Sequence, residues 1–174
     1  MNDDKGDKGR QTRFAALCES LRPDLVRFAF WLARDRALAE DVVQEAMLRA
    51  WKSFESLDDE AKAKQWMLTI VRREHARTWE RKRLEVTNVD ALVEAEAEVL
   101  ASEDDAAVTE MREALFRLED DYREPLVLQV MMGYTTGEIA TQMGLTQGAV
   151  LTRLFRARQK LRAALEGGSP EGER

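Results

Sequence analysis

The chain has 174 residues, of which 44% are hydrophobic and 34% charged, and its formal net charge is -6. This size allows one or two small domains, and the composition excludes a wholly disordered protein. A single cysteine, Cys18, excludes a disulfide framework and a thiolate zinc site within one chain, and we expect a buried structural thiol rather than a redox sensor. No apolar run approaches the ~20 residues of a membrane span, and the first residues lack a signal-peptide core, so we expect a cytoplasmic protein.

Four helices are predicted in the first half of the chain, after a disordered tail over residues 1–11. The first helix begins near Thr12, and the other three run over 24–33, 37–54 and 61–84. Pro23 opens the second of these helices at its first turn, where proline costs little. Short breaks are expected at 34–36 and 58–60.

Residues 85–104 lose apolar periodicity and become rich in acids and alanine, which predicts an acidic linker. Helices are then predicted from Asp105 to Leu118 and from Tyr122 to Met132, followed by a helix-turn-helix. Residues 167–174 are expected to be a frayed tail. The predicted fold is therefore all-α, with two small helical domains over 12–84 and 105–166, and the C-terminal one contains the helix-turn-helix.

The mean charge hides two basic regions on either side of an acidic one. Residues 72–83 hold six bases and two acids, whereas residues 90–121 hold twelve acids and two bases. Non-specific affinity for duplex DNA comes from neutralising phosphates, so the free chain should bind DNA poorly unless another molecule delivers it.

The stretch from Tyr134 to Leu161 predicts two helices joined by a tight turn. Thr136 can cap the first helix, Gly144 can end it, and Leu145 fills the angle before Thr146 caps the second. The inner strip of the second helix is Val150, Leu154, Ala157 and Leu161. Its other face carries Arg153, Arg156, Arg158, Lys160 and Arg162. Such a unit is typical of DNA readers, although a helical hairpin with a solvated basic face fits the same spacing.

The helix over 37–54 carries a polar stripe beside its apolar residues. The stripe consists of Asp41, Gln44, Glu45 and Leu48, which share one face by their i, i+3, i+4, i+7 spacing. It suits docking on a partner helix, and a solvated face is the alternative interpretation.

The helix over 61–84 has one inward face and one crowded basic face. The inward face is Trp66, Met67, Ile70 and Val71. The basic face is Arg72, Arg73, His75, Arg77, Arg81, Lys82 and Arg83, with Trp79 among them. Aromatic rings among arginines suit single-stranded nucleic acid, since each stacked base contributes ~1–3 kcal/mol. Trp66 also fits a core position, and Trp79 fits either role. His75 is the only histidine, so a metal site or catalysis there is not expected.

The order of these elements resembles the sigma-70 family of bacterial RNA polymerase initiation factors, in particular its two-domain extracytoplasmic-function (ECF) group. The segment LAEDVVQEAMLRAWKSFESL, followed by WMLTIVRREHAR, resembles region 2 of the family, with its D-x-x-Q-E pattern at Asp41, Gln44 and Glu45. The segment GEIATQMGLTQGAVLTRLFRARQKL resembles region 4, although Gly144 and Leu145 reverse the family's L-G pair.

The resemblance implies a protein that is not an enzyme and needs no cofactor or metal. Its implied partners are core RNA polymerase, bound at the flap and at the clamp helices of the largest subunit, and promoter DNA. A separate anti-sigma factor would hold it inactive and could keep it near the membrane, without insertion of the chain itself. The acidic linker would thread toward the polymerase active site and RNA-exit channel.

The resemblance also sorts the candidate residues into three groups. The polymerase-binding group is Asp41, Gln44, Glu45 and Leu48. The group for the promoter −10 element is Trp66, Arg72, Arg73, His75, Arg77, Trp79, Arg81, Lys82 and Arg83. The group for the −35 element is Thr146, Gln147, Ala149, Leu151, Thr152, Arg153, Phe155, Arg156 and Arg158.

Two departures from the family pattern concern the promoter sequence. Arg73 stands where the family often has asparagine, and Leu151 stands where a basic residue is usual. An apolar side chain at 151 could contact a thymine methyl group instead of a phosphate or guanine.

Two other functions share part of these features. A free-standing helix-turn-helix regulator would bind operator DNA without polymerase, as a dimer at paired half-sites. A nuclease would need clustered carboxylates for metal ions. Its best candidates, Asp58, Asp59 and Glu60, lie in a predicted turn, and the sequence has no Gly-rich phosphate loop.

Overall fold

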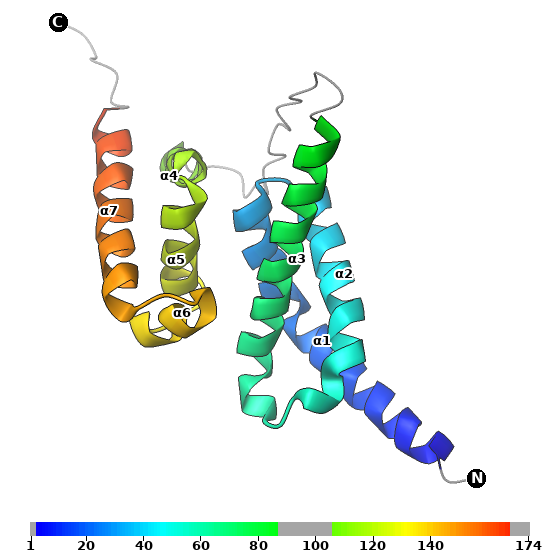
Figure 1. Ribbon diagram of the computed structural model, residues 1–174. Coiled ribbons are helices and arrows are strands. Elements are labelled where there is room, and N and C mark those ends of the chain that lie inside the picture. The colour runs from blue at the N-terminus through cyan, green and yellow to red at the C-terminus, as the bar shows by residue number, and fades with distance from the viewer. Residues whose placement is uncertain (1–2, 87–105, 168–174) are drawn as a thin grey trace, which may run out of the picture. The chain divides into compact units, whose positions relative to one another are not determined.

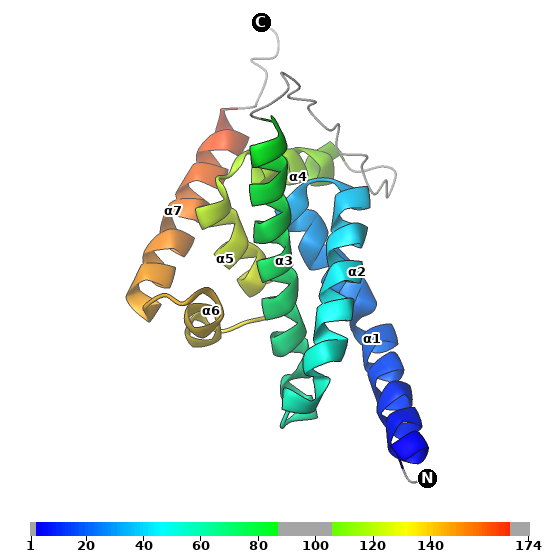
Figure 2. The same cartoon turned by 45° about the vertical axis from the view of Figure 1, so that its right-hand side comes forward.

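The computed structural model describes residues 3–86 and 106–167, and every regular element in these ranges is a helix (Figures 1 and 2). The chain divides into two compact units, unit 1 (Met1–Ala97) and unit 2 (Glu98–Arg174). The all-α prediction with two helical domains is thereby confirmed. Most of the predicted linker, and the tail after residue 167, lie outside the described residues.

Unit 1 is built from three long helices: α1 (Asp3–Ala33), α2 (Arg36–Ser53) and α3 (Ala63–Val86). The 3-10 turns η1 (Phe54–Ser56) and η2 (Glu60–Lys62) lead from α2 to α3. Each of the three helices packs against the other two. Their shared core includes the almost fully buried residues Leu25, Phe28, Val42, Val43, Met67, Leu68 and Val71.

Helix α1 begins at Asp3, where the sequence predicts a disordered tail. The difference has a tertiary cause, because two early side chains dock on the end of α2. The Arg10 guanidinium lies 4.4 Å from the centroid of the Trp51 ring and donates to the Trp51 carbonyl at 3.0 Å. The Phe14 ring packs on Trp51 and Phe54, with centroid separations of 5.2 and 5.1 Å. Packing of this kind holds a polar segment in a helix that would be marginal alone.

Helix α1 also continues through Pro23, where two separate helices are predicted. Proline lacks an N–H, so the helix loses the one hydrogen bond that would reach back to the Glu19 carbonyl. Both residues are exposed, so water can reach that carbonyl. The fully buried Leu25 and Phe28 follow at once, and their packing holds the helix across the proline. Helix α1 ends as predicted, with Arg34 in the left-handed region at φ 61°.

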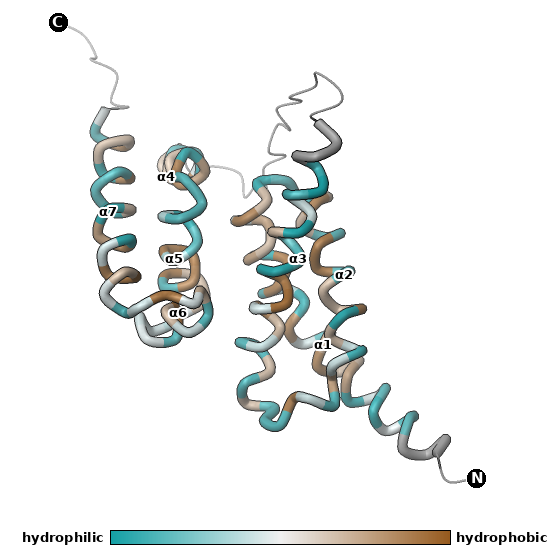
Figure 3. Tube along the Cα trace, in the orientation of Figure 1, coloured by the Kyte–Doolittle hydropathy of each residue, from teal (hydrophilic) through white to brown (hydrophobic). Residues whose placement is uncertain are grey.

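Unit 2 contains α4 (Ala106–Arg117), α5 (Asp120–Val130), α6 (Thr136–Met143) and α7 (Gln147–Glu166). Helix α7 packs against the other three. The core of the unit includes Leu115, Leu126, Val127, Leu128, Ile139, Val150, Leu154 and Ala157. Apolar and polar stretches alternate along α7 in Figure 3, as expected for a helix with one buried face.

A buried arginine closes the turn between α4 and α5. Arg123 is 1% exposed and donates to the Leu118 carbonyl at 2.7 Å and to the Asp120 carboxylate at 2.5 Å. A charge buried to this degree is tolerated only when it is paired and hydrogen-bonded, as it is here.

The described residues bear on two expectations, the absence of a membrane span and the structural role of Cys18. Within them, no helix is long and apolar enough to cross a membrane. The Cys18 thiol is half-buried, and burial raises its pKa above the ordinary value. A raised pKa leaves less of the reactive thiolate at neutral pH, which favours the structural interpretation of this cysteine.

Candidate nucleic-acid interface

The first helix of the helix-turn-helix starts with a reciprocal cap. Thr135 is the N-cap: its hydroxyl accepts from the Glu138 amide at 3.3 Å, and the Glu138 carboxylate accepts from the Thr135 amide at 2.8 Å. The prediction of Thr136 as the cap is therefore wrong by one residue. The T-x-x-E spacing of a capping box identifies Thr135, because only that threonine has a glutamate three residues later. These hydrogen bonds from Thr135 lower the pKa of Glu138.

The turn between the two helices follows the predicted signals. Gly144 ends α6 in the left-handed conformation at φ 65°, which glycine adopts without steric cost. The Leu145 amide donates to the Ala140 carbonyl at 2.9 Å. The Thr146 hydroxyl caps α7 by accepting from the Ala149 amide at 3.2 Å, so this predicted cap is confirmed. These bonds fix the angle at which α7 leaves α6.

The outer face of α7 presents two large apolar side chains. Leu151 is 53% exposed and Phe155 is 62% exposed, whereas Val150 and Leu154 are buried. Residues four apart lie on the same helix face, so Leu151 and Phe155 form an apolar pair near the start of α7. The exposed Thr152 lies beside them and donates to the Gly148 carbonyl at 3.0 Å.

The basic residues of α7 divide into two sets. Arg153 pairs with Asp121 of α5 at 3.0 Å, and Lys160 pairs with Glu119 at 3.3 Å. Arg158 donates to Gln129 of α5. Arg156 is exposed and has no such partner within the described residues, so it is the basic group most available to a ligand beside the apolar pair.

Three other predicted −35 residues play local roles. Thr146 uses its hydroxyl as the cap, and the Gln147 amide donates to the Thr136 hydroxyl at 2.9 Å. Ala149 is half-buried. Thr146 and Gln147 remain exposed, and the exposed side chains of α7 that form no hydrogen bond or ion pair with the other described helices of unit 2 include Leu151, Thr152, Phe155 and Arg156.

The polar stripe of α2 is fully on the surface. Its four residues, Asp41, Gln44, Glu45 and Leu48, are all exposed. The buried residues of the same helix, Ala39, Val42, Val43, Ala46 and Ala50, occupy the opposite side. Leu48 is 55% exposed at the C-terminal end of this row, so the exposed stripe includes one large apolar side chain.

The predicted −10 residues of α3 occupy two flanks of the helix rather than one face. Residues two apart lie ~200° apart around a helix, so Arg77 and Trp79 point to different sides. Trp79 is 57% exposed and lies seven residues after Arg72, on the same flank. Arg73 and Arg77 are exposed on the flank toward α2.

The remaining residues of this set differ in burial. Arg81 and Lys82 are exposed, and Arg72, Trp66 and His75 are half-buried. Met67 and Val71 face inward with no exposed surface, as predicted. Arg83 belongs to α3, and its side chain lies outside the described part of the chain.

One charged residue of α3 was missed by the sequence analysis. Glu74 is 2% exposed and accepts ion pairs from Arg49 of α2 at 2.5 Å and from Arg77 at 2.6 Å. The signal for its burial was available, since Glu74 follows the inward residues Met67 and Val71 at i+7 and i+3.

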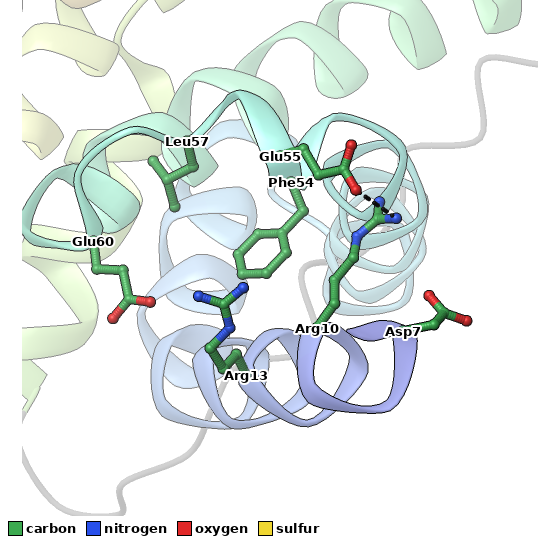
Figure 4. Close-up of a pocket in the computed structure, with 7 residues that line it drawn as sticks. All are labelled: Asp7, Arg10, Arg13, Phe54, Glu55, Leu57 and Glu60. Atoms are coloured by element: carbon green, nitrogen blue, oxygen red, sulfur yellow. Dashed lines mark ion pairs between the residues drawn. The ribbon is translucent and has the colours of Figure 1, made fainter. Parts of the chain in front are cut away.

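A pocket of about 630 Å³ lies where the start of α1 meets η1 and η2 (Figure 4). It is lined by Asp7, Arg10, Arg13, Phe54, Glu55, Leu57 and Glu60. The dashed line in Figure 4 marks the 3.1 Å ion pair between Arg10 and Glu55. None of the residues predicted to bind polymerase or promoter DNA lines this pocket. The described residues contain no group of three or more His, Cys, Asp or Glu side chains that could hold a metal ion.

Comparison with known proteins identifies the family to which the two units belong. The chain matches the sequence models of sigma-70 region 2 over residues 17–85 and of sigma-70 region 4 over residues 109–161. It is 34% identical over 148 residues to the ECF RNA polymerase sigma factor SigL of Mycobacterium tuberculosis, with 82% of each chain covered. It is 31% identical over 160 residues to the ECF sigma factor EcfG of Rhodopseudomonas palustris, covering 86% of this chain and 87% of that one.

A solved structure shows the same fold. The sigma factor RpoE of Bartonella quintana, in complex with the anti-sigma factor NepR, has a TM-score of 0.80 and 27% sequence identity. The match covers 90% of this chain and 99% of that one. Both units thus correspond to parts of one known architecture, and the chain belongs to the sigma-70 family, in its group of ECF RNA polymerase sigma factors.

Proposed function

We propose that this chain binds core RNA polymerase and directs it to promoters through three separate surfaces. Family membership supports the general role. The assignment of one binding surface to each of α2, α3 and α7 rests on side-chain exposure. Leu48 on α2, Trp79 on α3 and Phe155 on α7 are each more than half exposed. Each of these side chains would supply apolar contact area, and the polar or basic groups around it would supply the specific contacts.

The stripe of α2 is proposed to dock on the polymerase. Asp41 and Glu45 supply carboxylates, Gln44 supplies an amide, and Leu48 supplies apolar area at one end. A row of this kind complements a helical partner with basic and apolar positions at matching spacing. The resemblance to region 2 points to the clamp helices of the largest subunit as that partner.

Helix α3 is proposed to engage the −10 element. The exposed ring of Trp79 can stack on an unpaired base, which supplies ~1–3 kcal/mol per base toward keeping the strands apart. Arg73, Arg77 and Arg81 on the same helix would contact the backbone. Trp66 is half-buried and is proposed to position the start of α3.

Helix α7 is proposed to read the −35 element in the major groove. Leu151 and Phe155 form an apolar surface that suits the methyl groups of thymines, and Arg156 suits a phosphate or a guanine. The ion pair of Arg153 with Asp121 holds that arginine toward α5, so we assign it to the edge of the contact.

An anti-sigma factor is proposed as a further partner, because the similar RpoE structure contains one. The proposal assigns no catalytic role to any residue of the chain, and it places the protein in the compartment that holds RNA polymerase.

The proposal is tested by gel filtration with core polymerase and by run-off transcription on fragmented genomic DNA, with sequencing of the transcript starts. We expect co-elution, and starts that lie downstream of a shared pair of sequence elements. Glu45→Lys reverses the charge of one residue of the stripe and should weaken the affinity for core polymerase about tenfold or more. A tenfold loss corresponds to about 1.4 kcal/mol of binding free energy. Glu19→Lys, the same change at another exposed position, on α1, should leave this affinity unchanged.

Two results would contradict the proposal. One is the absence of a stable complex with core polymerase. The other is a strong mobility shift of duplex DNA by the isolated protein at moderate salt, which would indicate a free-standing regulator instead.

A further inference from the structure

The flank of α3 that faces α2 holds two arginines on one buried carboxylate. Glu74 Oε1 lies 2.5 Å from Arg49 Nε and 2.6 Å from Arg77 Nη1. Because both nitrogens contact the same oxygen, they are at most about 5 Å apart. Arg49 comes from α2 and lies outside the predicted DNA-binding set, so the contact extends the basic surface from one helix to two.

This cluster has a net positive charge that faces solvent. Two guanidinium groups share one carboxylate, and the arginine side chains are 49% and 52% exposed whereas that of Glu74 is 3% exposed. The negative charge of Glu74 is thus covered by protein, whereas both guanidinium groups can be reached by a ligand. A buried carboxylate that accepts two charge-assisted bonds also holds the like-charged groups together against their repulsion.

The chemistry of the exposed donors identifies the ligand class. A guanidinium carries five N–H donors, and the bonds to Glu74 engage one nitrogen of each arginine. The remaining donors match the oxygens of a phosphate in spacing and planarity. Arg73, one turn before Arg77 on the same flank, is exposed as well, which makes this flank a path for a phosphate backbone.

We propose that Arg49 and Arg77, positioned by Glu74, bind one phosphate group of the promoter DNA backbone. The proposal rests on the proposed function, in which α3 engages promoter DNA. Glu74 acts as a positioning residue: it orders two long side chains before DNA arrives, so less side-chain entropy is lost on binding.

The test measures the salt dependence of DNA binding by the full chain in complex with core polymerase. The probe is a fluorescent promoter fragment taken from the transcript starts mapped above. Each neutralised phosphate contributes ~0.7 (single strand) to ~0.9 (duplex) to the slope of log K against log salt concentration. The double variant Arg49→Gln/Arg77→Gln should therefore lower the slope by about one phosphate, although it removes two charges.

A matched control separates this effect from a loss of surface charge. Arg27 is 54% exposed and pairs with Asp24 at 3.6 Å, so Arg27→Gln removes a similar arginine from α1. Its slope should equal that of the wild-type chain. A double-variant slope equal to wild type would overturn the proposal, and so would a decrease of about two phosphates, which indicates independent contacts.

Glu74→Gln tests the positioning role through the sign of its effect. The substitution makes the surface more positive, so charge alone predicts tighter binding to DNA, whereas loss of positioning predicts weaker binding. We expect weaker binding by about fivefold or more. If circular dichroism shows that this variant does not fold, the arginine variants at half-exposed positions still decide the matter.

The two proposals fail in different ways. No complex of the wild-type chain with core polymerase removes the proposed function. A normal wild-type complex and transcript, with a double-variant slope equal to wild type, removes only the phosphate site. Loss of polymerase affinity without any change in the DNA slope would assign Arg49 and Arg77 to the polymerase contact and would likewise overturn the site.

Discussion

The stability of the cap at the start of α6 depends on pH through the carboxylate of Glu138. Hydrogen bonds from the Thr135 amide and hydroxyl hold its pKa below the ordinary value of 4.5. A carboxyl whose pKa is lowered on folding stabilises the folded state above its unfolded pKa, and that contribution disappears as pH falls through the folded value. The cap should therefore be intact at neutral pH and lost in acid.

We expect Glu138→Gln to be less stable than the wild-type chain at pH 7, with a difference that closes as pH falls below about 4.5. The measurement is thermal unfolding, followed by circular dichroism at several values between pH 7 and pH 3. Thr135→Ala serves as a control, because it removes the other half of the capping box and should cost about 1 kcal/mol at pH 7. A difference that stays constant over this range would show that the carboxylate is not the stabilising group.

Single residues also show where sequence reasoning stops. Thr135 and Thr136 are both acceptable caps by type, and only the pairing with Glu138 distinguishes them. Glu74 appears in the sequence as a charge that reduces a basic patch, yet its position at the spacing of Met67 and Val71 buries it. The exposure of Trp79 could not be settled from sequence, because an aromatic residue among arginines satisfies the pattern of either a core or a stacking surface.

At the scale of elements, the N-terminal part of α1 depends on tertiary contacts. Phe14→Ala should cost roughly 2 kcal/mol, below the 3–5 kcal/mol of a fully buried phenylalanine, because Phe14 is only half-buried. Hydrogen exchange should then become faster over residues 7–16 and remain slow around Phe28.

The matched control is Arg22→Ala, an exposed position on the same helix. It should leave exchange over residues 7–16 unchanged. Slow exchange of this segment in the Phe14 variant would mean that the helix is stable without its docking contacts.

Most helix positions followed from apolar spacing, and the errors occurred where a distant contact decides the outcome. The start of α1 depends on Trp51 and Phe54, which lie some forty residues later in the chain. The breaks at Arg34 and Gly144 depend only on neighbouring residues, and they were predicted correctly. Local signals were thus readable from the sequence, and long-range packing was not.

At the scale of the whole molecule, the two units have separate cores. Leu68 in unit 1 and Leu154 in unit 2 are both almost fully buried. Leu68→Ala and Leu154→Ala should each cost about 2–5 kcal/mol. We expect each substitution to destabilise its own unit only, as measured by hydrogen exchange resolved along the chain. Faster exchange in both units for either variant would show that the two fold as one cooperative body.

The distribution of charge is also a property of the whole chain. Basic residues clearly outnumber acidic ones on α3 and on α7, whereas the net charge of the chain is -6. Affinity for DNA phosphates is set by the local patches, but long-range steering is set by the total charge. We therefore expect such a molecule to approach DNA slowly when free and to bind it once held close, as a subunit of a larger complex would.

The proline in α1 has a mechanical consequence. Between Glu19 and Pro23 the helix lacks one backbone hydrogen bond, and this position separates the segment docked on Trp51 from the segment in the core of unit 1. Helices bend most easily where such a bond is absent. A tilt of the segment before Pro23 about this point would leave Leu25 and Phe28 in place, but it would have to break the contacts of Arg10 and Phe14 with Trp51.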